Sequence, residues 1–93
     1  PLASALSRVQ KAQNFARNKQ LEQALHEAQA AVALAPNAIQ TNLALADVLV
    51  EMDQLQQARA SYEKALQLAK TVEPEFQIRS VPDIERRLQS LSR

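Results

Sequence analysis

Apolar residues recur at three- and four-residue spacing along most of the chain, which is the pattern of amphipathic helices. Short polar or proline-containing breaks separate four such stretches, which predict helices over about 2–17, 21–34, 38–52 and 54–70. The break at 35–37 contains Pro36, and the residue before a proline is pushed out of the helical region. The pattern therefore predicts two consecutive helix–turn–helix units.

The periodicity weakens after these four helices and returns near the C-terminus. We expect a bend at Pro74 and a helix start at Ser80 and Pro82, because serine can cap a helix and proline tolerates its first turn. An apolar stripe follows, made of Val81, Ile84, Leu88 and Leu91. The sequence thus predicts a linker over 73–80 and a short helix over 81–92 that caps the second hairpin. The alternative is that this apolar face pairs with another copy of the chain.

The chain resembles itself when it is shifted by 34 residues. The matched positions carry mostly small or apolar residues: Ala12 and Ala46, Leu21 and Leu55, Ala24 and Ala58, Ala31 and Ala65, Leu34 and Leu68. A helix–turn–helix unit of this length cannot bury its apolar face alone, so copies stack into a solenoid. An unrelated antiparallel bundle with alanine-rich helices is the alternative, but chance matches would not concentrate at positions of close helix approach.

These residues resemble the pattern of the tetratricopeptide repeat family: a small residue, an aromatic three later, alanines in the second helix and a closing proline. The first copy has Ala12, Phe15, Ala24, Ala28, Ala31 and Pro36, and the second has Ala46, Leu49, Ala58, Tyr62 and Ala65. The resemblance covers about residues 5–70, and the second copy is the better match. It implies an all-α fold, an α-solenoid of two antiparallel hairpins over 3–36 and 38–72 with a fifth, C-terminal helix.

Both copies depart from the family pattern, the first at several positions. Lys19 and Asp53 replace the usual glycine between paired helices, and we expect Asn18 and Asp53 to take the left-handed conformation there. Arg8 and Lys11 stand where large apolar residues are usual, which suits a repeat with no neighbour on that side. An apolar strip indicates the opposite, an edge that awaits a neighbour, and consists of Leu2, Leu6 and Val9. Both interpretations stay open.

Composition narrows the classes of function. The 93 residues carry a formal net charge of +1, which gives no electrostatic footprint for nucleic acid or an anionic membrane. No apolar run approaches the roughly 18 residues that a spanning helix needs. Cysteine and glycine are absent, and the only histidine, His26, is expected on the outward side of its helix. We therefore expect no enzyme activity, cofactor, metal, nucleic acid or membrane partner.

The organisation of the parent protein is a further expectation. The chain opens on Pro1 and not on methionine, so we expect a single domain over 1–93 that is a piece of a longer chain. The absence of cysteine leaves the compartment open, with the cytoplasm favoured.

The family resemblance implies a concave groove that is lined by the first helix of each pair and holds a peptide or partner protein. Carried over by register, the groove residues are Leu6, Val9, Gln13, Arg17, Gln40, Leu43, Asp47, Val50 and Glu51. The hypothesis is an interaction module that presents this groove to a peptide, a partner protein or another domain of its parent chain. The alternative is a structural domain that forms a homo-oligomer through its apolar edges.

The charge of the predicted groove allows two interpretations. Asp47 and Glu51 are four residues apart on one helix face, so their like charges repel weakly. They form either an acidic spot that receives a basic partner segment or a pair that Arg17 of the neighbouring helix neutralises.

Overall fold

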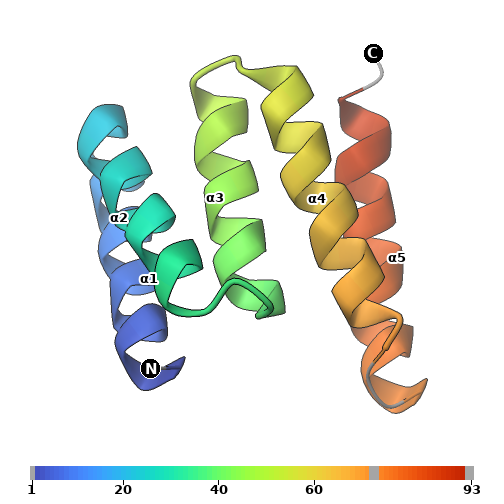
Figure 1. Cartoon of the computed structure of the whole chain (residues 1–93). Helices are drawn as coiled ribbons and strands as arrows, with labels where there is room; N and C mark the ends of the chain where they lie inside the picture. The colour runs from blue at the N-terminus through green and yellow to red at the C-terminus, as the bar shows by residue number, and fades with distance from the viewer. Residues whose placement is uncertain (1, 72–73, 92–93) are drawn as a thin grey trace.

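The computed structural model describes residues 2–71 and 74–91, with the backbone alone for 74–80. The described chain folds into five helices: α1 (Leu2–Arg17), α2 (Leu21–Leu34), α3 (Ile39–Glu51), α4 (Leu55–Ala69) and α5 (Pro74–Ser90). Helix α1 pairs with α2 and α3 with α4, each as an antiparallel hairpin, and α5 lies along α4 (Figure 1). The predicted all-α solenoid of sequential hairpins is confirmed. The first two helices have the predicted bounds, and α3 and α4 differ by one residue at each end.

Buried alanines lie where the helices pack against one another. Three pairs of alanines that match across the 34-residue shift are completely buried in both copies: Ala12 and Ala46, Ala24 and Ala58, Ala31 and Ala65. An alanine side chain ends at Cβ, so two helices can approach closely where alanine faces the neighbour. The repeat seen in the sequence is therefore a repeat of packing positions.

The fifth helix is longer than predicted. It begins at Pro74, so the predicted linker over 73–80 is wrong for residues 74–80, and residue 73 lies outside the described residues. Pro74 occupies the first helical position, where the missing N–H is no loss. We expected Pro82 in that role, but it lies inside the helix. An interior proline costs about 3 kcal/mol, and the burial of Ile84 in the core of the second hairpin offsets part of this cost.

The predicted cap is confirmed by the packing of α5. Ile84 is completely buried in the core of the second hairpin, together with Tyr62 and Ala65 of α4. The other members of the predicted stripe pack against the same core: Val81, Leu88 and Leu91. Helix α5 thus covers the end of the second hairpin with the face that the sequence identified.

Two turns inside the hairpins use the left-handed backbone conformation without glycine. Lys19 has φ of 62° and Asp53 has φ of 61°. The expectation was right for Asp53 and wrong for Asn18, since Lys19 is the residue with positive φ in the first turn. Both turns close in the same way, with the N–H of Gln20 donating to Phe15 O and that of Gln54 to Leu49 O. The geometry of the turn, and not the preference of the side chain, selects the position.

Two buried polar residues join α3 to the connection that precedes it. The Thr41 hydroxyl donates to the carbonyl oxygens of Ala35 and Ala38, at 2.7 and 3.1 Å. The Asn42 amide donates to Pro36 O and Ala38 O, at 3.0 and 2.8 Å. The Asn42 amide is the donor to Pro36 O, a bond that a large apolar residue at position 42 could not make. Asn42 therefore has a structural role between the hairpins.

Replacing Ile84 with alanine tests whether α5 is part of the cooperative core. We expect a loss of about 2–4 kcal/mol in the free energy of unfolding, because the side chain is fully buried. Urea denaturation followed by circular dichroism measures the change. Leu55→Ala is the control, since Leu55 is 38% exposed and its truncation should cost less than about 1 kcal/mol. Equal stability losses in the two variants would contradict the cap.

Replacing Lys19 with glycine tests the cost of the left-handed turn. We expect a gain of about 0.5–1 kcal/mol in the free energy of unfolding, because glycine adopts positive φ without a Cβ clash. The ion pair of Lys19 with Glu51, at 4.0 Å and largely exposed, contributes too little to offset this gain. Asn18→Gly, one residue earlier, should give no gain in thermal or urea denaturation.

Candidate functional site

A groove of about 390 Å³ runs between α1 and α3. Its buried and half-buried lining is small and apolar, and consists of Ala12, Ala16, Ala44 and Val48. Its exposed lining is polar or charged, and consists of Gln13, Arg17, Lys19, Asp47 and Glu51. The floor follows from the repeat packing, because Ala12 and Val48 also belong to the core that joins the two hairpins. The groove thus exists because small residues let α1 and α3 pack closely, and polar side chains surround its floor.

Four of the nine predicted groove residues lie together in this hollow. Gln13 and Arg17 come from α1, and Asp47 and Glu51 come from α3. In each helix the two residues are four apart, so they lie on one face one above the other. The structure therefore brings together four of the five polar members of the predicted set.

The other five predicted residues lie elsewhere. Val9 is buried and packs with Ala31 and Ala44, whereas Leu43 and Val50 pack against the core of the second hairpin. Leu6 is exposed on α1, and Gln40 is exposed near the start of α3, where it lines a second hollow with Leu2.

The apolar members of the predicted set were also expected to line the groove. Val9, Leu43 and Val50 pack in the core instead. The prediction missed this because helical register alone does not say which side of an apolar stripe a neighbouring helix covers. The expected strip of Leu2, Leu6 and Val9 is also reduced, since only Leu2 and Leu6 are exposed, at 52% and 37%.

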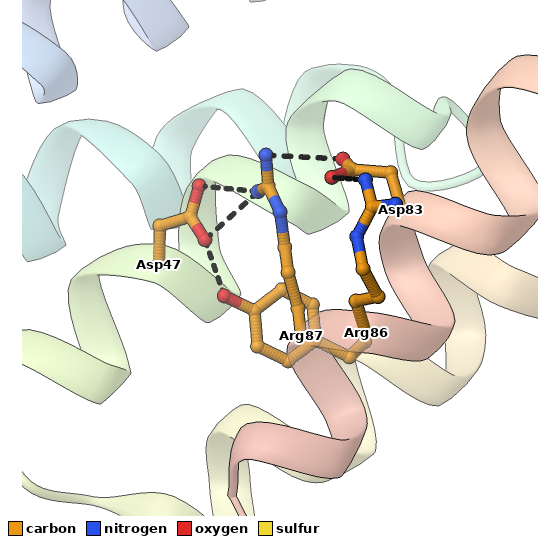
Figure 2. Close-up of polar contacts among 5 residues, drawn as sticks. Asp47, Asp83, Arg86 and Arg87 are labelled. Carbon is orange, nitrogen blue, oxygen red and sulfur yellow. Dashed lines mark hydrogen bonds and ion pairs between the residues drawn. The ribbon is translucent and has the colours of Figure 1, made fainter.

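Asp47 is neutralised by α5 and not by α1. Nη1 of Arg87 donates to both carboxylate oxygens of Asp47, at 3.1 and 3.0 Å (Figure 2). Arg17 instead donates to Asn14 of its own helix at 3.5 Å. The interpretation that Arg17 neutralises this spot is therefore corrected, because the cation paired with Asp47 is Arg87, 40 positions later. The interpretation as a spot that receives a basic partner segment stays a prediction.

Arg87 is held between two carboxylates. Its Nη2 lies 3.2 Å from Asp83 Oδ2, one turn earlier on α5, while Nη1 contacts Asp47 (Figure 2). Arg86 also reaches Asp83, at 3.3 Å. Burial alone would lower the pKa of Arg87, but Asp47 and Asp83 raise it above its ordinary value. Arg86 is exposed, whereas Arg87 is half-buried.

Tyr62 completes this network from the core side. Its side chain is only 3% exposed, and its hydroxyl donates to Asp47 Oδ1. Burial, together with the hydrogen bond and the charge of Asp47, raises the pKa of Tyr62 above the ordinary value of 10.0. The sequence identified Tyr62 as a repeat position but gave no local signal for its partner, because Asp47 lies on the preceding helix.

Among the residues that the structure describes, other charged side chains near the surface make no comparable network. Arg8 pairs with Glu27 at 3.0 Å and joins α1 to α2, whereas His26 is exposed on α2 as predicted. Within the described part of the chain, no group of three potential metal ligands comes together. In the same residues, no helix is both long and apolar enough to span a membrane.

The fold and the groove define a helical-repeat protein of the α-solenoid class. Residues 39–71, which contain α3 and α4, match the family model of the tetratricopeptide repeat. The match confirms the resemblance seen in the sequence for residues 39–71, the copy that was the better match. The five-helix arrangement is consistent with this family, whose members are typically non-catalytic and generally bind proteins. No curated protein matches the chain.

The pKa of Tyr62 predicts a loss of stability in alkali. Since the folded-state pKa lies above the unfolded value of 10.0, the stabilisation is complete below pH 10 and falls as the pH rises further. We expect the free energy of unfolding to fall by up to about 1 kcal/mol per pH unit above pH 10. Urea denaturation of the wild type and Tyr62→Phe over this range measures the effect. The difference between them should shrink with pH, and parallel curves would contradict the assigned pKa.

Proposed function

We propose that the chain is a protein-interaction module that holds a segment of a partner protein, or of another domain of its parent chain, in the α1–α3 groove. The observation that carries this proposal is the combination of a small apolar floor with an exposed polar rim. Such a floor lets a partner backbone or small side chain approach closely, while polar rim groups fix its orientation.

The dimensions of the groove favour a peptide-like occupant. Its volume of about 390 Å³ is at the small end of the range of ligand sites, which suits a few side chains of a longer segment. The hollow lies between two neighbouring helices, where either a helix or an extended segment can lie along them. We infer that the partner contributes small apolar side chains to the floor and polar groups to the rim.

The rim supports binding over catalysis. Its exposed groups are an amide, two cations and two carboxylates, and its lining contains no serine, cysteine or histidine. Nucleophilic catalysis needs such a group beside a general base. Asp47 is also committed to Arg87 and Tyr62, which leaves it less free to move a proton.

Blocking the groove with one bulky side chain tests the proposal. Peptides would be selected from a displayed random library against the whole chain, and their affinities measured by fluorescence anisotropy. We expect Gln13→Trp to weaken the selected peptides at least about tenfold, because the indole fills the rim above the alanine floor. Gln29→Trp is the matched control, since Gln29 is exposed on α2 and does not line the groove.

Two outcomes would contradict the groove as the binding site. Selected peptides could bind Gln13→Trp as well as the wild type, or both tryptophan variants could weaken binding equally. Circular dichroism would establish that both variants retain the helical content of the wild type.

A further inference from the structure

Asp47 takes part in two structures at once. It lines the α1–α3 groove, and it holds Arg87 of α5 by two hydrogen bonds. The Asp47 side chain is 50% exposed and that of Arg87 is 38% exposed, so solvent and any partner in the groove can reach the pair. Exposed pairs of this kind are weak and open readily.

The Asp47 carboxylate already accepts most of the hydrogen bonds that it can accept. A carboxylate accepts about four hydrogen bonds, and Asp47 already accepts two from Arg87 and one from Tyr62. A second cation at the same carboxylate would also be repelled by the Arg87 guanidinium. A cationic side chain of a partner can therefore pair fully with Asp47 only if Arg87 moves away.

Arg87 has an alternative position that costs little. Asp83 lies one turn earlier on the same helix and already contacts Nη2 of Arg87 at 3.2 Å. When Arg87 leaves Asp47, its charge stays paired with Asp83. Tyr62 meanwhile keeps its bond to Asp47 from the core side, so the carboxylate stays at the groove wall. The network is built so that one contact can open without leaving a charge unpaired.

The other carboxylate of this wall also holds a cation of the chain itself. Glu51 lies one turn after Asp47 and is paired with Lys19 at 4.0 Å, with both side chains well exposed. The α3 wall therefore carries two carboxylates, each covered by a weakly held internal cation. These two carboxylates complement a basic side chain of the partner, which must approach them past the rim cations Arg17 and Lys19.

We propose that Arg87 is an internal competitor for a basic side chain of the groove partner, and that its bond to Asp47 latches α5 to the groove wall. The inference rests on the proposed function of the groove. An arginine or lysine of the partner displaces Arg87 onto Asp83 and takes its place on Asp47. Because coupling between two binding events is reciprocal, removal of the latch strengthens binding of the cation.

A small guanidinium compound tests this competition on the full chain. N-acetyl-arginine N-methylamide would be titrated into the protein, and its affinity measured from NMR shifts of the α3 amides and the Tyr62 ring. We expect Arg87→Gln to bind it about two- to fivefold more tightly than the wild type, the range for a partly exposed ion pair. Arg86→Gln is the matched control and should resemble the wild type, since Arg86 contacts Asp83 and is 72% exposed. The double variant Arg87→Gln with Asp47→Asn should lose the response.

Two further arms keep the test decisive. The citrulline counterpart of the probe, which has nearly the same shape without the charge, should cause no shifts. Asp83→Asn removes the alternative position of Arg87, so it should weaken binding of the arginine probe, opposite to Arg87→Gln. This variant leaves the Arg87 side chain in place and decides the question if Arg87→Gln fails to fold.

The proposal is overturned if Arg87→Gln and the wild type bind the arginine probe equally, if neither binds it, or if citrulline binds as well. An affinity gain in Asp83→Asn would also overturn it. The probe is too small to need the groove floor, so its titration is independent of Gln13. Equal peptide affinity for the wild type and Gln13→Trp would contradict the groove as the binding site. Equal affinity of the arginine probe for the wild type and Arg87→Gln would contradict only the proposed role of Arg87.

Discussion

The structure depends on how closely neighbouring helices can approach, and alanine sets that distance. Each hairpin is too small to bury its apolar stripe, so it must share a core with the next element. Completely buried alanines at equivalent positions of both copies allow this, for example Ala24 in α2 and Ala58 in α4. The same constraint shapes the groove, because Ala12 and Ala44 line its floor while being buried themselves.

Polar groups complete the packing where the apolar contacts end. Thr41 and Asn42 satisfy the carbonyl groups of the connection before α3, which joins the first hairpin to the second. On the other side of α3, Asp47 links the groove wall to Tyr62 of α4 and Arg87 of α5. Two sets of contacts hold α5 against the second hairpin. Ile84 packs in its apolar core, and Arg87 pairs with Asp47 in the polar network. The cap and the candidate site are therefore physically connected.

Much of the fold could be predicted from local pattern. Helical periodicity gave the bounds of α1 and α2 and came within one residue for α3 and α4. The 34-residue repeat indicated the hairpins and the family, which the match over 39–71 bears out. The stripe containing Ile84 predicted the docking of the last helix. These features were readable because each depends on residues close together in sequence.

The features that were missed depend on contacts between distant segments. Pro74 and Pro82 both satisfy the rule for a first helical residue, and α5 begins at Pro74, which no local rule distinguished from Pro82. The register predicted Gln13, Asp47 and Val9 in one groove. Gln13 and Asp47 line the α1–α3 hollow, whereas Val9 is buried against Ala31 and Ala44. No local rule could predict the partner of Asp47, because Arg87 lies 40 residues away in sequence and contacts Asp47 only when α5 packs on α4. Periodicity specifies which face of a helix is apolar, whereas the neighbour that covers this face, and the charges left at its border, follow from the assembled chain.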